Sequence, residues 1–174
     1  MDRAIRVRPA GSDEADLIAS ILQEAAEWLR RRGAPLWLDS ELLPEDIARH
    51  ASEGRYFIAE VDGEPAGTMR FEYTDPEFWP DVAQGESAFV HRLAVRRRFA
   101  GRGVSAALLA SAAERARASG CRYLRLDCDA ARPKLKVLYE GFGFRYHSDR
   151  QVGPFHVSRY EIRLTSDEEE NTRG

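Results

Sequence analysis

The sequence predicts an α/β fold of the α+β type, with a mixed, mostly antiparallel central sheet of about seven strands and helices on both faces. Segments with the period-two alternation of strands interchange with segments that have helical spacing of apolar residues along the whole chain. The pair Asp62-Gly63 between two strand-like runs is a hairpin signal. A length of 174 residues with 43% hydrophobic residues suits a single domain, which we place at residues 1-165.

The elements expected before residue 74 follow from caps and alternation. Ser12 and Asp13 are good N-caps for a first helix that Gly33 ends. Pro44 suits the first turn of a second helix, which Gly54 ends. The predicted strands in this part are residues 5–10, 56–61 and 65–73.

The second half continues the same alternation. An irregular stretch precedes a strand at Ala88–Val95, and Gly120 ends a helix that begins at Gly103. The remaining predicted elements are a strand at residues 122–128, a helix from Pro133, a strand at 144–147 and a last strand within 155–164. Residues 166-174 form an acidic tail that we expect to be disordered.

The charge and the apolar runs exclude several classes of partner. The formal net charge is -3 at pH 7 and the basic cluster at Arg96–Arg98 is local, so we expect no nucleic-acid partner. No apolar run approaches the roughly 20 residues of a membrane span, and MDRAIRVRPA lacks the apolar core of a signal peptide. We therefore expect a cytoplasmic protein with no membrane partner.

The cysteines and histidines indicate neither a disulfide nor a metal site. Cys121 and Cys128 stand at the edges of one strand-like run, roughly 23 Å apart at about 3.3 Å per residue, far beyond disulfide reach. They should be free thiols. The histidines lack metal-ligand spacing, so no metal is assigned.

The stretch RRRFAGRGVS, Arg96–Ser105, combines bare backbone with positive charge where a strand turns into a helix. A helix start presents unpaired N–H groups and a partial positive charge. Gly101 and Gly103 lack the Cβ atoms that would keep an anion from the backbone. An isolated G-x-G is equally typical of an ordinary turn. The stretch matches neither a nucleotide P-loop nor G-x-G-x-x-G, because Ala106 stands where the last glycine would be.

Two motifs together resemble the GNAT-type acyltransferase superfamily. RFAGRG at residues 98–103 fills the pattern R/Q-x-x-G-x-G/A at a helix start, after a strand that ends near a valine. LYEGFGF at residues 138–144 matches L-Y-x-x-x-G-F. The likeness is strong over residues 66–144 and rests on element order elsewhere. It implies a GNAT-like fold and N-acetyltransferase activity.

The resemblance implies acetyl-CoA as the acetyl donor. Its pyrophosphate would lie on main-chain N–H groups of the turn, and its pantetheine arm would pair with the end of the preceding strand. The cofactor-binding residues implied are Leu93, Ala94, Val95, Arg98, Gly101, Arg102, Gly103, Val104, Ser105, Arg132 and Tyr139. Arg132 stands where many relatives carry an asparagine, so that residue's polar contact is expected to be lost or altered. Ser105 replaces a common glycine or alanine and either donates to a phosphate oxygen or only tolerates the position.

Acetyl transfer from a thioester to an amine needs a neutral amine, a stabilised oxyanion and a protonated leaving thiolate. Tyr139 is the predicted acid, because its reference pKa of about 10 lies above that of a thiol at about 8.5. A backbone N–H near the end of strand 88–95 is expected to polarise the carbonyl.

The base that deprotonates the amine is left open between two candidates. His91 has the better intrinsic pKa for neutral pH, and strand alternation puts it on the face of Phe89, Leu93 and Val95. Glu86 lies just before the strand and would need a raised pKa or a bridging water. We place His91 slightly ahead of Glu86.

Aromatic and acidic residues of the first helix and the loops are the candidates for the acceptor site, because such side chains hold cationic amines. The predicted substrate-binding residues are Trp28, Trp37, Trp79 and Asp127, with Phe78 and the acids Asp39, Glu41, Asp75, Glu77 and Asp81 in the same regions. Asp127 is also a third candidate base, with an ion pair to Arg125 or Arg92 as its structural alternative. WLRRRGAPLW resembles a subgroup of small-molecule acetyltransferases, which favours a small-molecule amine as the acceptor.

Two other functions remain open at this point. The chain could acetylate an amine of a protein or peptide, which an open, peptide-width groove would favour. It could instead be a non-catalytic module that binds acyl-CoA. Either a monomer or a homodimer is compatible with the sequence.

Overall fold

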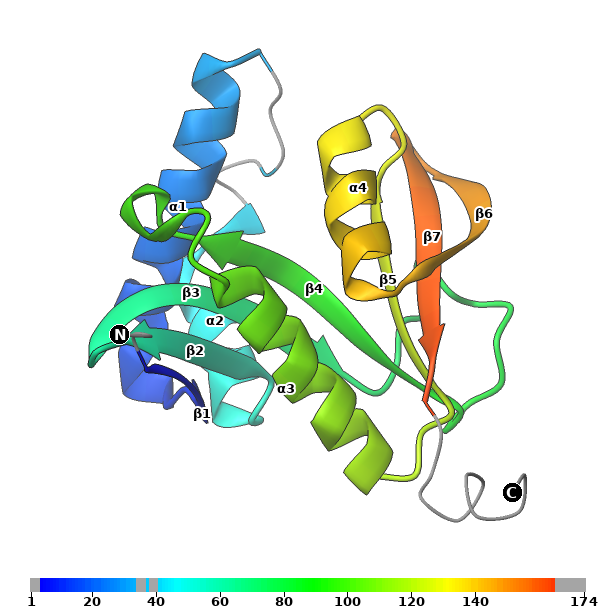
Figure 1. The fold of residues 1–174 in the computed structure, drawn as a ribbon, viewed down its shortest axis with the longest axis horizontal. Coiled ribbons are helices and arrows are strands. Elements are labelled where there is room, and N and C mark those ends of the chain that lie inside the picture. Colours follow the sequence, from blue (N-terminus) through cyan, green and yellow to red (C-terminus); the bar gives the residue numbers. More distant parts are fainter. Residues whose placement is uncertain (1–3, 34–36, 38–40, 165–174) are drawn as a thin grey trace. The chain divides into compact units, whose positions relative to one another are not determined.

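The structure is a computed structural model that describes residues 4–33, 37 and 41–164 (Figure 1). Its strands are β1 (Ile5–Pro9), β2 (Tyr56–Val61), β3 (Glu64–Glu72), β4 (Ser87–Val95), β5 (Tyr123–Asp129), β6 (Arg145–Val152) and β7 (Phe155–Arg163). Its helices are α1 (Ala15–Arg31), α2 (Pro44–Ser52), α3 (Val104–Ala118) and α4 (Pro133–Phe142), with short 3-10 turns at Ser12–Glu14 and Arg97–Phe99. The strands form a 7-stranded sheet in the order β1-β2-β3-β4-β5-β7-β6. The predicted fold class is confirmed, while the predicted tail at 166–174 lies outside the described residues.

The chain divides into two compact units, each described by itself. The first unit comprises residues 1–71 and 92–111, and the second comprises residues 72–91 and 112–174.

In the first unit, β1 pairs antiparallel with β2, and β2 pairs antiparallel with β3. The predicted hairpin turn is confirmed: Asp62 and Gly63 have φ values of 51° and 83°, the left-handed conformation that a two-residue turn between twisted strands requires. Buried residues of α1, α2 and β2, among them Ile18, Ile47 and Ile58, form a core on one face of these strands.

The helix α3 covers the other face of the same strands at close range. Side chains alternate along β2, so Ala59 faces away from the core that contains Ile58, and Gly67 of β3 pairs with Ala59. A Cβ atom on Gly67 would lie 2.9 Å from the carbonyl oxygen of Ala94 and 2.9 Å from Cγ1 of Val104. The missing side chain therefore lets the first turn of α3 approach the sheet.

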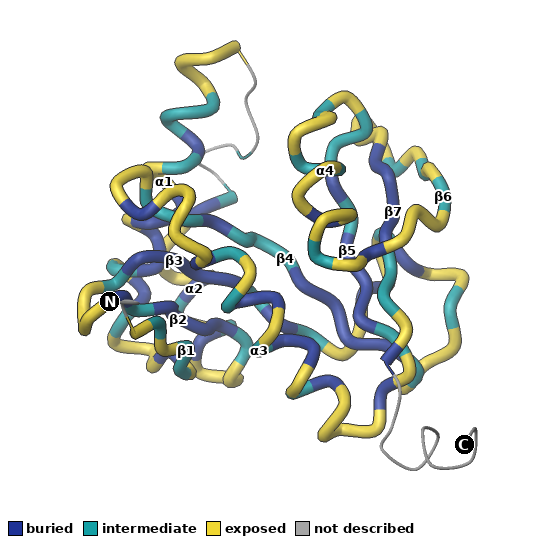
Figure 2. Tube along the Cα trace, viewed as in Figure 1, coloured by how far each residue is buried: buried dark blue, intermediate teal, exposed yellow. Residues whose placement is uncertain are grey.

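In the second unit, β4 pairs in parallel with β5 from Ser87–Tyr123 to Phe89–Arg125. β7 lies antiparallel between β5 and β6, so the sheet is mixed as predicted. The strand β6 is exposed or half-buried along its whole length, whereas the middle of β7 is buried (Figure 2).

Two predicted element boundaries are wrong. Ser12 and Asp13 do not cap α1: they lie in a 3-10 turn, and the Glu14 carboxylate accepts from the N–H of Gly11 at 3.1 Å. The strand predicted at 144–147 extends from Arg145 to Val152. Its sequence RYHSDRQV is polar because β6 lies at the sheet edge, so it has no apolar alternation to reveal its length.

Cys121 and Cys128 are free thiols, as predicted, and both are buried. Among the described residues, no helix combines the length and the apolar character that a bilayer crossing requires.

Because the backbone and α3 approach Gly67 closely, even an alanine at this position should destabilise the folded protein. Gly67→Ala would press a methyl group against a backbone oxygen and should lower the free energy of unfolding by about 1–3 kcal/mol. Urea denaturation measures this change. Gly141→Ala in α4 is the matched control: no atom lies within 4 Å of its Cβ, and alanine should stabilise the helix by about 1 kcal/mol. Equal stability of both variants would contradict the packing described for Gly67.

Candidate active site

The turn before α3 exposes main-chain N–H groups. Gly101 and Gly103 have φ values of 75° and 82°, a conformation that favours glycine, and both are exposed. The carbonyl of Gly103 accepts from the N–H of Ala107 at 3.0 Å, so the helix starts there. Helix geometry leaves the N–H groups of the first turn without an acceptor inside the helix. This turn is suited to bind an anion.

The basic cluster before this turn is fixed by α1 within the first unit. The N–H of Arg97 donates to Glu24 at 3.1 Å, and a guanidinium nitrogen of Arg96 donates to Ser20 at 3.0 Å. The guanidinium of Arg97 lies 3.7 Å from the centre of the Trp28 ring. These contacts hold the start of the turn in place.

Trp28 has contacts with the protein's own cations. Its ring is contacted by Arg97 and also by Arg32, whose guanidinium lies 4.2 Å from the ring centre. Trp28 therefore supports the basic turn, and its predicted contact with the acceptor stays a prediction.

The other predicted cofactor residues of the first unit surround the same turn. Arg98 and Arg102 are exposed, Arg98 forms an ion pair with Glu64, and both guanidinium groups lie over the buried ring of Phe99. Val104 is buried at the start of α3, and Ser105 is half-buried. Leu93, Ala94 and Val95 end β4, with Ala94 buried and its neighbours half-buried.

In the second unit, one histidine and two aspartates from distant segments come together. One ligand atom each of Asp75, His91 and Asp127 lies within 4.8 Å of the others. His91 Nε2 is 3.2 Å from Asp75 Oδ2. Burial alone would raise the pKa of Asp75, but the hydrogen bond and charge of His91, with the N–H groups of Phe78 and Glu77, outweigh burial and lower it.

Asp127 lies in the opposite environment. Burial, together with the charges of Asp75 and Glu77, raises the pKa of Asp127 to about 6, although His91 and Arg159 act to lower it. Its Oδ1 atom is buried and has no hydrogen-bond partner among the described residues. This carboxylate can accept a proton or attract a cation.

The Asp75–His91–Asp127 cluster also offers three ligand atoms that could hold a divalent ion. No metal was predicted from the sequence, because its histidines lack metal-ligand spacing. Histidine spacing cannot reveal a site that is built from one histidine and two aspartates of separate segments.

Comparison with known proteins identifies the family. Residues 22–144 match the acetyltransferase (GNAT) family. The chain is 33% identical over 162 residues to the N-acetyltransferase YesJ of Bacillus subtilis (strain 168), itself described as uncharacterized, with 88% of each chain covered. The chain belongs to the GNAT acetyltransferase family. It is therefore an acyltransferase, as the two motifs implied.

Solved GNAT structures have the same fold. A GNAT-family acetyltransferase from Listeria monocytogenes matches with a TM-score of 0.77 and 24% identity, over 92% of this chain and 95% of that chain. The GNAT domain of S. lividans PAT matches with a TM-score of 0.69 and 26% identity, over 92% and 90%. The acetyltransferase yncA from Salmonella typhimurium, solved with acetyl-CoA, matches with a TM-score of 0.69 and 17% identity, over 93% and 95%.

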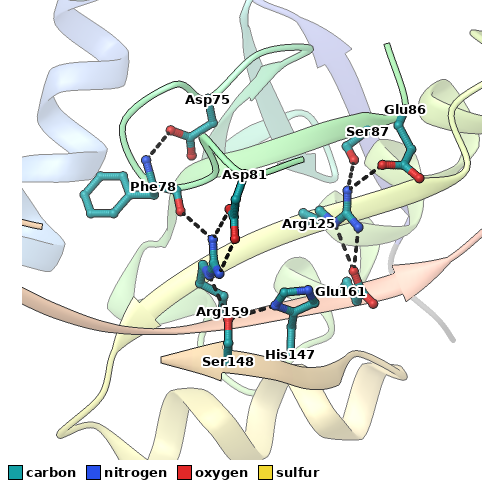
Figure 3. A network of polar contacts seen from close by, with 10 residues as sticks. All are labelled: Asp75, Phe78, Asp81, Glu86, Ser87, Arg125, His147, Ser148, Arg159 and Glu161. Carbon is teal, nitrogen blue, oxygen red and sulfur yellow. Dashed lines mark hydrogen bonds and ion pairs between the residues drawn. The ribbon is translucent and has the colours of Figure 1, made fainter. Parts of the chain in front are cut away.

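Two buried arginines organise the second unit of this GNAT protein (Figure 3). Arg159 of β7 forms a two-pronged ion pair with Asp81, at 2.6 and 3.0 Å, and donates to the carbonyl of Phe78 at 3.1 Å. Its Nε donates to Ser148 of β6 at 2.9 Å. The loop between β3 and β4 is thereby attached to the sheet, and Asp81 is engaged in this attachment.

Trp79 lies in the same network. Only 2% of Trp79 is exposed. Its ring lies 4.5 Å from the guanidinium of Arg159 and 5.1 Å from that of Arg125, and it also contacts Phe89 and His147. Trp79 therefore packs the loop against the sheet, and its predicted role in binding the acceptor stays a prediction.

Glu86 is part of the second arginine's ion-pair group. Arg125 donates to Glu161 at 2.9 Å, contacts Glu86 at 3.4 Å, and donates to the hydroxyl of Ser87 (Figure 3). These contacts also exclude the predicted alternative in which Arg125 pairs with Asp127. Because Glu86 is engaged by Arg125, the geometry favours His91 over Glu86 as the base.

The geometry of β4 changes at Arg92. Its φ of 55° interrupts the extended backbone directly after His91. Side chains alternate between two faces only along an extended strand, so alternation no longer predicts that His91 shares a face with Leu93 and Val95.

The ring of Trp37, a predicted acceptor residue, lies 5.5 Å from the Arg92 guanidinium. Asp39 lies outside the described residues.

Tyr139 and Arg132 belong to α4 and its N-terminus. Tyr139 is buried beside Phe144 and Tyr160, with ring centres 6.0 and 6.4 Å away. Burial, with smaller effects of Cys128 and Asp127, raises the pKa of Tyr139 well above its ordinary value, so the phenol keeps its proton at neutral pH. Arg132 is the N-cap residue of α4, 3.6 Å from the carboxylate of Asp129.

The contact of Asp75 with His91 and that of Arg159 with Asp81 were not predicted from the sequence. Asp75 lies in an irregular stretch without periodicity, so nothing in the sequence connects it to His91. Arg159 stands between Ser158 and Tyr160 in the sequence, with Glu161 two residues further on, so its strand pattern gives no clear sign that its side chain is buried and must be paired.

The raised pKa of Asp127 predicts a stability difference that depends on pH. Because the folded pKa of about 6 lies above the ordinary 3.8, the folded protein binds the proton more tightly, and stability falls as pH rises from about 4 to 6. Asp127→Asn removes the buried charge and should raise the free energy of unfolding by about 2–3 kcal/mol at pH 8. Near pH 4 the gain should nearly vanish.

Urea denaturation at both pH values tests this expectation. Glu114→Gln is the control, because Glu114 is exposed on α3 and should change little at either pH. A gain for Asp127→Asn that is the same at pH 4 and pH 8 would contradict a buried charge as its cause.

Proposed function

We propose that this GNAT protein transfers the acetyl group of acetyl-CoA to the primary amine of a small molecule, by direct attack in a ternary complex. The observation that carries the proposal is the exposed turn at Gly101–Gly103, where two left-handed glycines precede the first residues of α3, Val104 and Ser105. Its N–H groups and the nearby Arg98 and Arg102 would hold the diphosphate of the coenzyme. The Salmonella relative that shares the fold was solved with acetyl-CoA.

The pantetheine arm would pair with the main chain of Leu93–Val95, as the family resemblance implies. Such pairing uses backbone groups and therefore needs no particular side chain. We also propose a cytoplasmic location, which the free thiols of Cys121 and Cys128 support.

His91 is the proposed base, and Asp75 positions it. His91 Nε2 lies 3.2 Å from Asp75 Oδ2, so Nδ1 would take the proton of the amine and the carboxylate would stabilise the resulting imidazolium. Asp127 would attract the ammonium form of the acceptor. As the deprotonated amine attacks the thioester carbon, the C–S bond breaks and Tyr139 is proposed to protonate the departing thiolate.

The turn predicts a specific loss of coenzyme binding. Gly103→Trp places a large side chain over the N–H groups and should weaken acetyl-CoA binding at least tenfold, measured by isothermal titration calorimetry. Gly120→Trp at the other end of α3 is the matched control, since Gly120 has nearly the same φ, 79° against 82°, and an open environment. Equal affinities for both variants would contradict the diphosphate site.

The choice of base predicts opposite results for two variants. His91→Gln should lower kcat by about 10²–10⁴-fold, the usual contribution of a general base. Glu86→Gln should stay within a few-fold of the unchanged protein, because Glu86 serves as a partner of Arg125. A thiol-release assay over a panel of amines and one lysine peptide measures both. A larger loss for Glu86→Gln would transfer the role of base to Glu86.

A further inference from the structure

Arg92 has a backbone conformation that its place in a strand does not explain. Its φ of 55° is left-handed, and among the described residues Asp62 is the one other non-glycine residue with positive φ. Asp62 belongs to a hairpin turn that requires this conformation, whereas Arg92 lies inside β4. Strained residues within regular elements concentrate at functional sites.

The side chain of Arg92 is half-buried, and part of its guanidinium lacks a partner. Its Nη1 atom is buried and has no hydrogen-bond partner among the described residues. Burial lowers the pKa of the guanidinium, Arg70 lowers it further, and Tyr56 and Glu41 act to raise it. A guanidinium with a buried, unpartnered nitrogen gains from an added anion.

The shape of this environment indicates the class of anion. The ring of Trp37 lies 5.5 Å from the Arg92 guanidinium, and a guanidinium presents a planar fork of donors that suits a planar acceptor group. A carboxylate matches such a fork with two parallel hydrogen bonds and carries the single charge that one guanidinium balances. The coenzyme's diphosphate already has the turn at Gly101–Ser105 as its proposed site.

We propose that Arg92 binds a carboxylate of the acceptor, so that the acetylated substrate is an amine that also carries a carboxylic acid, such as an amino acid. The proposal rests on the proposed function and names its substrate class. Arg92 directly follows His91, the proposed base, in the chain. It is accordingly a residue that determines specificity for the acceptor.

The test compares amines that differ only in the acid group. Amino acids and ω-amino acids are assayed beside their carboxamides, with the unchanged protein, Arg92→Gln, Arg92→Lys and the surface control Arg49→Gln. We expect the unchanged protein and Arg49→Gln to prefer the acids at least tenfold in kcat/KM. Arg92→Gln should raise KM for the acids at least tenfold and change that for the carboxamides less than threefold. Arg92→Lys, which keeps the charge but not the fork, should lie between them.

Two further measurements make each outcome decisive. Acetyl-CoA affinity by calorimetry should be the same in all variants, and an affinity loss in Arg92→Gln would assign Arg92 to the coenzyme and overturn the proposal. Saturation-transfer NMR with 4-aminobutanoate and its amide reads acceptor binding without turnover, and equal binding of both by the unchanged protein would also overturn it. Acetylation of amines without any preference for acids would overturn this inference and leave the proposed function intact. Absence of both acetyl-CoA binding and turnover would remove the proposed function itself.

Discussion

The guanidinium of Arg159 is buried, and a buried charge persists in a folded protein only when it is paired and hydrogen-bonded. Asp81 and the carbonyl of Phe78 meet this requirement from the loop between β3 and β4. The same loop contains Asp75, whose backbone carbonyl accepts from the N–H of Trp79 at 3.0 Å. The contacts that pair the charge of Arg159 therefore also fix the loop that brings Asp75 to His91.

Two aspartates of one cluster illustrate how environment divides chemical roles. Asp75 accepts hydrogen bonds and faces an imidazole, so it stays ionised and orients His91. Asp127 has an unpartnered buried oxygen and a pKa of about 6, so its charge opposes folding at neutral pH. A pair of carboxylates whose pKa values are pushed apart in this way is typical of sites that handle protons and cations.

The order of elements and the turn before α3 could be predicted because they depend on local signals. Glycines at 33, 54, 63, 101, 103 and 120 all have positive φ, which only a glycine adopts at little cost. The roles of Trp28 and Trp79 could not be predicted, since both depend on arginines that are distant in sequence. An aromatic residue near acids looks the same in a sequence whether its ring receives a substrate or packs against the protein's own guanidinium groups.

Arg92 in the first unit and Asp127 in the second are half-buried charged residues, and each has a buried polar atom without a hydrogen-bond partner among the described residues. Folding alone would select against both, because a neutral side chain of similar size avoids the desolvation cost. An anion bound at Arg92 would relieve the cost there, and a cation bound at Asp127 would relieve the cost there. At each position, the free energy that desolvation costs the free protein would contribute to affinity and selectivity for a ligand group of the opposite charge.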